Sequence, residues 1–518
     1  MRYDAIVIGA GPNGLVAATV LAKRRKRILV LESAPEIGGH TRTIEFAPGY
    51  RSPLNEDRGW IPDRIKSLVG GLKGLTQVGH SESITVAGGG QRLTLSVNPQ
   101  QTAAALQRFS AKDAARWPGF VERLRKFSSI LEDLYQLTPP DIDTRSVTEV
   151  LPLLGVGRKL RALGRADMTE FLRVMPMSVQ DLLDDTFESE LLKAAVAACA
   201  VRDLQQGPRS GGTTYNLLHY MVGAPDGAIR GRHRFLEGPD AFAKAVAEQL
   251  QRRKVEIRTH APVTRITVRD DRVSGVVLAG GEEVEASLVI STADPKRTML
   301  ELVDPLGLDP EFMLAVRNVK LRGCTAFVFF AVDAAVVDKT DNPTFATMSL
   351  TADTTSLEKA ADAAKYSELS AEPHVEVFVP SHRWTGLAPE GQHVVTARVQ
   401  YAPYHLQGGW NDAHTTSLTQ KVTAAISRVI PGFAKGIVHA VALTPRDIEE
   451  RFGATEGALT HGELTLDQIL FMRPVPSWGH YAMPVDGLFL GGAGAHPGPG
   501  ILGGAGYLAA RVSSRAPH

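Results

Sequence analysis

Cysteine is almost absent from this sequence, which limits the redox and metal chemistry open to the chain. Cys199 and Cys324 are the only cysteines among 518 residues, and they form no Cys-x-x-Cys pair. A thiol redox pair and a cysteine-rich metal site are therefore excluded, and we expect no metal site. So low a cysteine content fits a reducing compartment, and we predict a cytoplasmic protein.

Long apolar runs and an excess of one charge are absent as well. No stretch of about 18 apolar residues occurs, so no segment is expected to span a bilayer. The 57 basic residues balance 56 acidic ones, and a net charge of +1 predicts no nucleic-acid partner. Because strand-like sequence begins at Tyr3, we expect no signal or transit peptide. A length of 518 residues exceeds one ordinary core and predicts two domains.

The amino-terminal end carries a glycine-rich turn between a predicted strand and a predicted helix. Residues 3–8 are a short β-branched run, and apolar residues recur at helical spacing over 15–26. The turn between them, residues 9–14, reads GAGPNG, and a second apolar run over 27–31 ends in Glu32. In this context the motif predicts a dinucleotide site, with Glu32 accepting hydrogen bonds from the adenosine ribose.

Each residue of the turn has a physical role in such a site. Gly9 permits the tight turn, Gly11 lets the backbone approach a pyrophosphate, and Gly14 lets helix and strand pack closely. Pro12 suits a first helical turn, where no amide donor is lost. The helix start at Pro12 and Asn13 then offers amide groups and a positive dipole end to the phosphates.

A pair of glycines follows the second strand at a fixed distance. Glu32 is separated by five residues from Gly38-Gly39. This spacing resembles the extended fingerprint of the FAD-dependent amine oxidase and phytoene desaturase superfamily. The resemblance implies FAD rather than NAD, with the paired glycines passing close to the cofactor. We add the neighbouring residues to the predicted cofactor site: Ser33, His40 and Thr41.

A second stretch with this resemblance lies between residues 244 and 300. We predict a helix over 244–253 and strands over 255–258, 264–269, 272–278, 283–286 and 288–291, with a hairpin at Asp270-Asp271. This order is similar to the superfamily's, in which a strand, a small β-meander and another strand return to the FAD domain. The resemblance places Val263 against the adenine, and we include Ala293 in the site. A plain structural hairpin at Val263 remains the alternative.

The carboxyl-terminal end is the second glycine-rich region. Residues 487–494 predict a strand that runs into glycines, 496–500 (HPGPG) cannot be helical, and 501–511 predict a helix with glycines near its start. Because a helical glycine costs about 1 kcal/mol against alanine, we expect a flat, bulky group to approach this backbone, and the isoalloxazine ring of FAD fits.

The same stretch closely resembles the terminal motif of phytoene desaturase-like proteins. It also resembles the branch called pyridine nucleotide-disulfide oxidoreductase domain-containing protein 2, although the sequence has no paired cysteines for a disulfide reaction. The resemblance implies FAD, and we expect it to be non-covalent because no cysteine lies near the motif. The predicted contacts are Gly492, Gly494, Ile501 and Leu502.

Together these segments predict an α/β protein with a discontinuous Rossmann-type FAD-binding domain and an inserted α+β substrate-binding domain. The predicted FAD-binding segments are 1–75, 232–300 and 481–518, and the substrate-binding segments are 76–231 and 301–480. Further predictions are long helices over 102–135, strands over 325–332, 374–379 and 393–399, and a cavity-lining loop over 472–481. Residues 153–175 mix leucine with basic residues. They predict either a surface helix or a helix pair in peripheral contact with a membrane.

A flavin at this junction predicts an oxidoreductase that passes a hydride from a substrate carbon to the cofactor. His496 is our candidate catalytic acid or base, because it titrates near neutral pH and lies close to the predicted flavin loop. A structural histidine bonded to backbone is the alternative, and His219, Tyr215 and Tyr220 are a weaker set. Because no second G-x-G-x-x-G motif follows a strand, oxygen or a quinone is the expected electron acceptor.

The resemblance implies a desaturase or isomerase of an apolar or alicyclic, polyene-like small molecule. An amine or amino-acid oxidase and a non-catalytic protein of the Rab GDP-dissociation inhibitor type are the alternatives. Two departures from the family argue against a long hydrocarbon. Residues 237–241 replace a Gly-Gly-Met-Gly-like turn, and Arg232-His233-Arg234 replaces a large hydrophobic residue. Arg232 or Arg234 could pair with a carboxylate, or the three residues could form a solvated basic loop.

Overall fold

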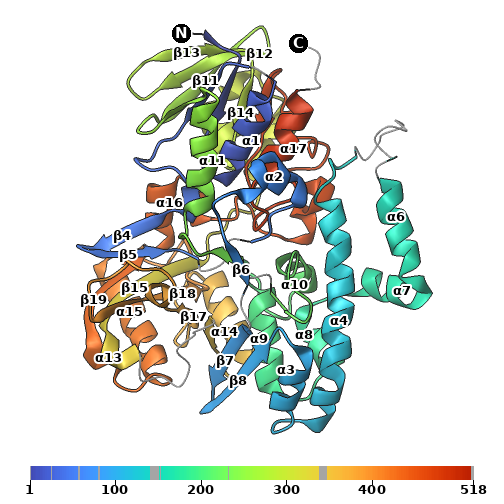
Figure 1. Ribbon diagram of the computed structural model, residues 1–518, viewed down its shortest axis with the longest axis vertical. Coiled ribbons are helices and arrows are strands. Elements are labelled where there is room, and N and C mark those ends of the chain that lie inside the picture. Colours follow the sequence, from blue (N-terminus) through green and yellow to red (C-terminus); the bar gives the residue numbers. More distant parts are fainter. Residues whose placement is uncertain are drawn as a thin grey trace.

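The structure is a computed structural model that describes residues 2–24, 26–55, 59–79, 82–140, 151, 153–230, 233–337 and 347–514. Figure 1 shows one part at the top, where both chain ends lie, and a second part below it with a large sheet on one side and helices on the other. The upper part combines the beginning, the middle and the end of the sequence.

A five-stranded parallel sheet forms the centre of the upper part. Its strand order is β10 (Glu256–Arg258), β3 (Ile28–Leu31), β2 (Ala5–Ile8), β14 (Val289–Ser291) and β20 (Leu488–Leu490). The four strands other than β10 are fully buried, as the covered faces of a parallel sheet require. Three distant chain segments thus build one sheet, and the predicted Rossmann-type arrangement is confirmed.

Helices and a small meander complete the upper part. Helix α1 (Pro12–Ala22) packs against α11 (Ala241–Arg252) and α17 (Gly504–Ser513). The antiparallel meander comprises β11 (Val263–Arg269), β12 (Arg272–Leu278) and β13 (Glu283–Ala286), and β1 (Arg2–Tyr3) is added in parallel to β13. Asp270 and Asp271 both have positive φ, 49° and 59°, as a tight two-residue hairpin turn requires. The predicted hairpin is confirmed.

A seven-stranded sheet dominates the lower part. Its order is β19 (Ile437–Leu443), β15 (Thr325–Asp333), β18 (Gln392–Gln400), β17 (His374–Phe378), β16 (Met348–Leu350), β7 (Glu82–Gly88) and β8 (Gln91–Ser96). All its neighbours are antiparallel except β16 and β7. The three strands predicted in this region are β15, β17 and β18. Helices on this sheet include α13 (Ala334–Val337), α14 (Thr354–Lys365) and α15 (Asp412–Ser427).

Helices on the other side of the lower part form a second core. They are α3 (Pro99–Leu106), α4 (Ala111–Leu134), α8 (Val179–Asp184), α9 (Glu190–Ala200) and α10 (Thr213–Tyr220). Helix α4 begins at Ser110, whose hydroxyl accepts from the amide of Asp113 and caps the first turn. Its buried side chains Trp117, Phe120 and Phe127 face this core. The long helices predicted over 102–135 are therefore confirmed.

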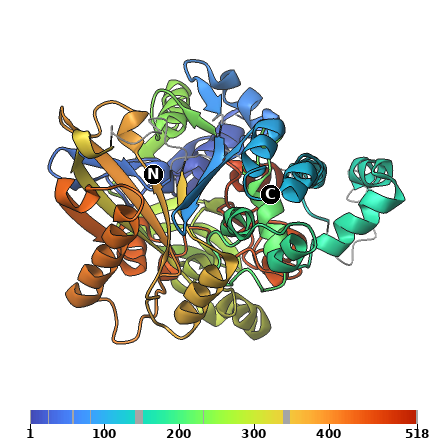
Figure 2. The same ribbon diagram turned by 90° about the horizontal axis from the view of Figure 1, so that it is seen from below.

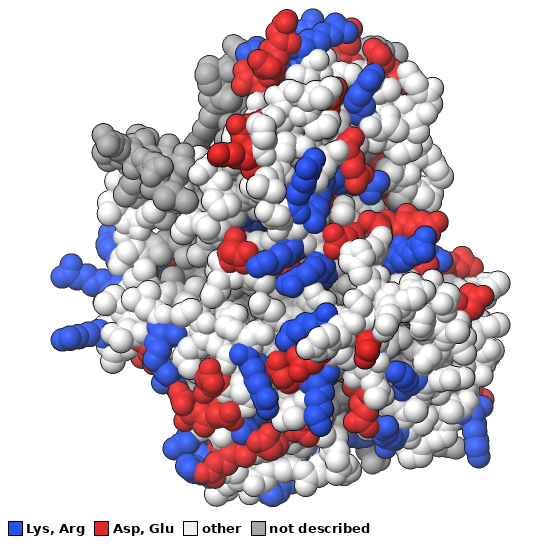
Figure 3. Space-filling view, turned by 180° about the vertical axis from the view of Figure 1, so that it is seen from behind, with Lys and Arg blue, Asp and Glu red and all other residues white. Residues whose placement is uncertain are grey.

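Helices α6 (Leu153–Ala162) and α7 (Gly164–Val174) project from the body of the protein in both ribbon views (Figures 1 and 2). Leu154 and Leu172 are more than half exposed. Within the described chain, no helix has the length and apolar character needed to cross a membrane. Figure 3 shows basic and acidic side chains intermingled over one face of the molecule, in keeping with the balanced net charge.

Short elements connect these parts. They are β4 (Thr43–Ala47), β5 (Tyr50–Pro53), α2 (Asp63–Leu68), β6 (Gln77–Gly79), β9 (His233–Phe235), a π-helix (Arg297–Leu302), α12 (Pro310–Arg317) and α16 (Pro445–Phe452). All five strands of the parallel sheet lie within the predicted FAD-binding segments. The domain boundaries themselves remain a prediction.

Candidate active site

A cavity of about 670 Å³ lies where the two parts meet. From the upper part it is lined by the turn after β2, by residues after β3 and by the stretch from Gly498 to Gly503. From the lower part it is lined by residues on and around α9, α10 and α16. The volume is within the range of small-molecule sites, and the carboxyl ends of parallel strands are where α/β sheets bind ligands.

The turn after β2 forms an open backbone cradle. Gly9 has φ +96°, and its amide donates to Leu31 O at 2.7 Å. At Gly14 a Cβ would lie 1.9 Å from Gly9 O, so only glycine lets α1 start this close to the strand. At Gly11, in contrast, the nearest atom to a Cβ would be Gly39 Cα at 3.8 Å. Gly11 and Gly39 thus lie close together without side chains, so this stretch of the cavity wall is bare backbone, which fits a pyrophosphate at the start of α1.

Glu32 lies at the edge of this cradle with its carboxylate fixed by backbone amides. Its two oxygens accept from Ala10 N at 2.8 Å and from Ala34 N at 2.9 Å. Because a carboxylate has about four acceptor positions, it can still bind the two hydroxyls of a ribose. Val263 lines the same end of the cavity, and Ala261 N donates to Glu32 O at 2.8 Å. The residues present therefore fit the adenosine half of FAD.

The glycines at the start of α17 have a packing role that the sequence did not predict. A Cβ at Gly503 would lie 2.6 Å from Val16 Cγ2, and a Cβ at Gly506 would lie 1.9 Å from Asn13 O. These glycines let α17 approach α1, and the expectation that they also make room for a flat ring stays a prediction. Gly498, Gly500 and Gly503 line the cavity.

Trp60 connects this stretch to the rest of the site. Its amide donates to Gly500 O at 2.9 Å, and its carbonyl accepts from Leu502 N at 2.8 Å. Trp60 also lines the cavity, but nothing in the surrounding sequence marks it as a site residue.

Most of the predicted cofactor-binding residues line this one cavity. They are Gly9, Gly11, Pro12, Asn13, Glu32, Ser33, Gly39, His40, Thr41, Val263, Ala293, Ile501 and Leu502. The remaining four, Gly14, Gly38, Gly492 and Gly494, lie behind the lining. A Cβ at Gly492 would lie 2.4 Å from Thr292 O, and one at Gly494 would lie 2.5 Å from Pro295 Cδ. These two glycines therefore serve close backbone packing, and individual contacts with FAD remain predictions.

His496 does not lie in the cavity lining. It is 2% exposed, and its Nε2 lies 3.2 Å from Leu134 O. Burial lowers the pKa of His496 to about 4, so the imidazole is neutral at pH 7. This environment matches the alternative of a structural histidine, and we do not propose His496 as the catalytic acid or base.

His219 ends a buried chain of hydrogen bonds instead. Its Nε2 lies 2.8 Å from Pro499 O, and its Nδ1 lies 2.8 Å from the hydroxyl of Tyr135. Since a carbonyl can only accept, Nε2 carries the proton and Nδ1 accepts from Tyr135. The hydroxyl of Tyr135 in turn accepts from that of Tyr215 at 2.8 Å. The chain is thus satisfied with a neutral His219, whose pKa burial lowers to about 4.

Two further histidines line the cavity from opposite parts of the protein. The rings of His40 and His461 meet edge to face with centroids 5.4 Å apart. Burial lowers the pKa of His40 to about 3 and that of His461 to about 4. All three cavity-lining histidines of the described chain are therefore neutral at physiological pH.

These buried histidines predict a loss of stability in mild acid. The folded-state pKa values lie below the unfolded value of about 6.5, so the unfolded chain takes up protons that the folded chain cannot. Stability is then full above pH 6.5 and falls as the pH drops towards 4, by about 2 kcal/mol per histidine at pH 5. Thermal unfolding at pH 7.5 and 5.0 measures the effect.

A matched pair of variants tests how much of this acid sensitivity comes from His219. His219→Gln can keep both hydrogen bonds without titrating, so its loss of Tm between pH 7.5 and 5.0 should be smaller than the native loss. His405→Gln, at a side chain 76% exposed, should leave the native loss unchanged. An equal loss of Tm in native protein and His219→Gln would contradict the prediction.

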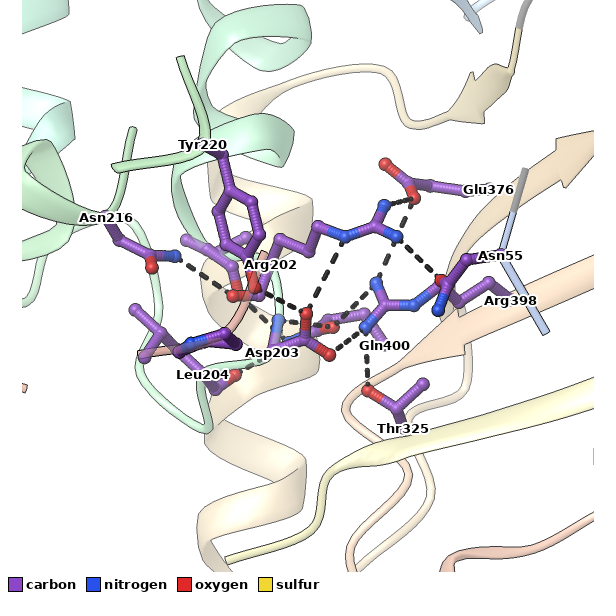
Figure 4. A network of polar contacts seen from close by, with 12 residues as sticks. Asn55, Arg202, Asp203, Leu204, Asn216, Tyr220, Thr325, Glu376, Arg398 and Gln400 are labelled. Atoms are coloured by element: carbon purple, nitrogen blue, oxygen red, sulfur yellow. Dashed lines mark hydrogen bonds and ion pairs between the residues drawn. The ribbon is translucent and has the colours of Figure 1, made fainter. Parts of the chain in front are cut away.

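A charged network forms the wall of the cavity contributed by the lower part (Figure 4). Arg202 and Arg230 both line the cavity and donate to the two oxygens of Glu376, at 2.7 and 2.8 Å. Arg202 also donates to Asn55 Oδ1 at 2.8 Å, and Asp203 accepts from the hydroxyl of Tyr220 at 2.8 Å. Burial alone would raise the pKa of Glu376, but Arg202 and Arg398 hold it below its ordinary value.

Sequence reasoning missed this network. Arg202-Asp203 follows the buried, alanine-rich helix α9. A charged pair directly after such a helix could have indicated a polar site at its end. Of the basic cluster that we did single out, Arg232 lies outside the described residues. His233 and Arg234 belong to β9, paired with β6, and Arg234 is not in the cavity lining. Arg230, two positions before this cluster, does line the cavity.

The loop over 472–481 was expected to line the cavity, and this expectation is wrong. None of its residues is in the lining. Trp478 packs edge to face on Phe312 at 5.0 Å, outside the site. Among the described residues no cluster of three histidine, cysteine or acidic side chains could hold a metal ion.

The fold and this cavity define an FAD-dependent oxidoreductase. The chain belongs to the flavin containing amine oxidoreductase family, whose model matches residues 13–505. It is 33% identical over 548 aligned residues to the rat protein named "Pyridine nucleotide-disulfide oxidoreductase domain-containing protein 2", covering 99% of this chain and 94% of the relative. It is 25% identical over 533 residues to the phytoene desaturase (neurosporene-forming) of Rhodobacter capsulatus, with 99% and 94% covered.

Among solved structures, cyclohexylamine oxidase from Brevibacterium oxydans has a TM-score of 0.60 at 15% identity, covering 99% of this chain and 98% of that one. At this identity the likeness concerns the fold. The predicted superfamily, cofactor and enzyme class are thus confirmed. Cys199 and Cys324 are both buried and form no disulfide, so the disulfide in the rat protein's name has no counterpart here.

Proposed function

We propose that this enzyme desaturates or isomerises an organic substrate, with a hydride leaving a substrate carbon that lies against the flavin. The supporting observation is that the GAGPNG turn and the stretch from Gly498 to Leu502, from opposite ends of the chain, line one cavity. Bound FAD supplies an acceptor for the two electrons and the hydrogen of a hydride. The protein holds the substrate carbon in place and excludes water.

We further propose that the substrate has an apolar or alicyclic framework with a polar end. Trp60, Val222 and Ile501 give the cavity apolar surface, whereas Arg202 and Arg230 give it a charged wall. A hydrocarbon held against that wall would bury polar groups without providing hydrogen bonds, which is costly. A carboxylate is the group that best matches a guanidinium, and a substrate carboxylate would share these two arginines with Glu376. A small acid of this kind therefore suits the cavity better than a long polyene.

Formation of a double bond also requires that a proton leave the substrate. We propose His461 as its acceptor, because it lines the cavity and its Nδ1 has no hydrogen-bond partner within the described chain. Burial lowers the pKa of His461 to about 4, which keeps the imidazole neutral but also makes it a weak base. The two electrons then leave to oxygen or a quinone, in keeping with the single dinucleotide motif of the sequence.

An amine oxidase is the alternative, and it predicts an aromatic cage around an ammonium group. Tyr220 is a cavity-lining ring that could contribute, but Arg202 Cζ lies 5.9 Å from its centroid and its hydroxyl is bonded to Asp203. A cation beside this ring would meet the guanidinium. The charged wall therefore favours an anionic substrate over an amine.

A substrate panel tests the proposal without knowledge of the electron acceptor. Matched pairs of an alicyclic acid and its amide, an unsaturated hydrocarbon and its ω-carboxylate, and aliphatic amines are added to the FAD-loaded enzyme without oxygen. We expect the acids to bleach the blue flavin band at least tenfold faster than their neutral partners. Faster bleaching by the hydrocarbon or the amines would contradict the proposal.

We also keep peripheral membrane contact as a proposal for α6 and α7. The exposed Leu154 and Leu172 occur there together with basic residues such as Arg158 and Arg161. An ordinary surface helix pair has the same features. Sedimentation of the protein with anionic vesicles would support membrane contact, and no sedimentation would support a surface helix pair. A cytoplasmic location also remains a proposal.

A further inference from the structure

Arg473 is a fully buried arginine directly behind the cavity wall. It is 2% exposed, and its five N–H groups make six hydrogen-bond contacts, three of them shared between the two N–H groups of Nη2. Every acceptor is a backbone carbonyl: Ala493 O twice, at 2.9 and 2.7 Å, and those of Thr460, Gly462, Glu463 and Gln468. Two of these residues, Thr460 and Ala493, line the cavity.

No carboxylate of the described chain forms an ion pair with this guanidinium. The two nearest acids in sequence are paired elsewhere: Asp467 accepts from Lys320 Nζ at 2.7 Å, and Glu463 directs its carboxylate to Arg322, at 2.6 and 3.1 Å. The titratable groups that do face Arg473 are uncharged. Tyr135 directly follows α4. Tyr215, His219 and Tyr220 belong to α10, and His461 and His496 lie in loops. Burial lowers the pKa of Arg473 to about 10, so it stays protonated at pH 7.

A buried ion without a counter-ion is costly, and carbonyl dipoles solvate such a charge without cancelling it. The field of Arg473 therefore extends into its low-dielectric surroundings. The cavity is close by, since a Cβ at Gly498, which lines it, would lie 3.6 Å from Arg473 Nε. An anion in this part of the cavity is stabilised by the guanidinium.

Reduction of a flavin creates such an anion. A hydride carries two electrons and one proton, so its transfer to the neutral oxidised ring leaves one negative charge unless a second proton is taken up. We infer that Arg473 is a positioning residue whose fixed charge behind residues 493–500 favours the negatively charged reduced flavin and thereby raises its midpoint potential. Charge near the ring is one of the ways in which proteins tune this cofactor.

Arg473 could instead only hold the loop over 460–468 against the cavity wall, and two variants separate charge from structure. Arg473→Lys keeps the charge with fewer hydrogen bonds, and Arg473→Met removes the charge. The midpoint potential of each FAD-loaded protein is measured at pH 7 against a reference dye during stepwise reduction. The measurement needs FAD but no substrate, so its outcome is independent of the proposed reaction.

We expect Arg473→Met to favour oxidised over reduced flavin at least tenfold more than the native enzyme, a midpoint about 30 mV lower. Arg473→Lys should stay within about half of that shift. A native midpoint in an FAD-loaded Arg473→Met protein overturns the inference, as does an equal shift in both variants.

If Arg473→Met does not fold or retain FAD, the lysine variant decides alone. Burial lowers the pKa of Arg473 to about 10, and the same burial should lower the pKa of a lysine here below its ordinary value of about 10.4. Its midpoint should then fall below the native curve as the lysine loses its proton. A midpoint parallel to the native one from pH 6 to 10 overturns the inference.

Discussion

Replacing Gly11 by valine is expected to leave a folded protein that no longer binds FAD. The backbone at Gly11 is extended, with φ −72° and ψ 175°, a conformation that valine adopts without strain. The nearest atom to a new Cβ is Gly39 Cα at 3.8 Å, an ordinary van der Waals contact, so the Cβ clashes with no protein atom. It does occupy the space reserved for the pyrophosphate. We expect FAD affinity to fall at least 100-fold, about 2.7 kcal/mol.

The purified Gly11→Val protein should be colourless, and titration with FAD followed by fluorescence quenching gives its affinity. Far-ultraviolet circular dichroism establishes that it is folded. Gly280→Val is the matched control, because its Cβ would have no neighbour within 4 Å and the position, between β12 and β13, does not line the cavity. A yellow Gly11→Val protein with native affinity would refute the assignment of this turn to the cofactor.

The cofactor half of the site could be predicted from the sequence because its signals are local. Each strand of the parallel sheet except the half-exposed β10 is a short, fully buried run. The GAGPNG turn joins β2 to α1, and Glu32 directly follows β3. Since parallel strands place their carboxyl ends at one edge, motifs after different strands must converge. Thirteen of the predicted cofactor-binding residues accordingly line the cavity.

The substrate half could not be predicted, because its contacts join distant segments. Glu376 lies 174 positions from Arg202 and 146 from Arg230, and none of the three stands in a motif. His496 shows a second limit: closeness in sequence to a flavin-binding stretch does not decide which way a side chain points. Its ring faces Leu134 O on the far side of the wall. The glycines of α17 show a third limit of prediction from sequence. Close helix packing and close ligand contact both favour glycine, so the residue type alone does not tell them apart.

Because α17 packs so closely on α1, we expect Gly506→Ala to lower stability strongly. A Cβ at Gly506 would lie 1.9 Å from Asn13 O and 2.6 Å from Asn13 C, far inside contact distance. Because these are backbone atoms at the start of α1, no side chain can turn away to relieve the clash. Either α17 moves out or the first turn of α1 distorts. Overpacking of this kind costs about 1–3 kcal/mol or more.

The Gly506→Ala clash also couples stability to cofactor binding, because Asn13 lines the cradle that holds the phosphates. We expect a lower Tm and at least a tenfold weaker affinity for FAD, measured by thermal unfolding with and without added cofactor. Gly157→Ala in α6 is the matched control: it is also a helical glycine, but its Cβ would have no neighbour within 4 Å. There alanine should leave FAD binding unchanged and Tm equal or slightly higher, because alanine favours a helix over glycine by about 1 kcal/mol. If Gly506→Ala behaved like Gly157→Ala, the two ends of the chain would not meet as closely as the site requires, and the convergence of both motifs on one flavin would lose its structural basis.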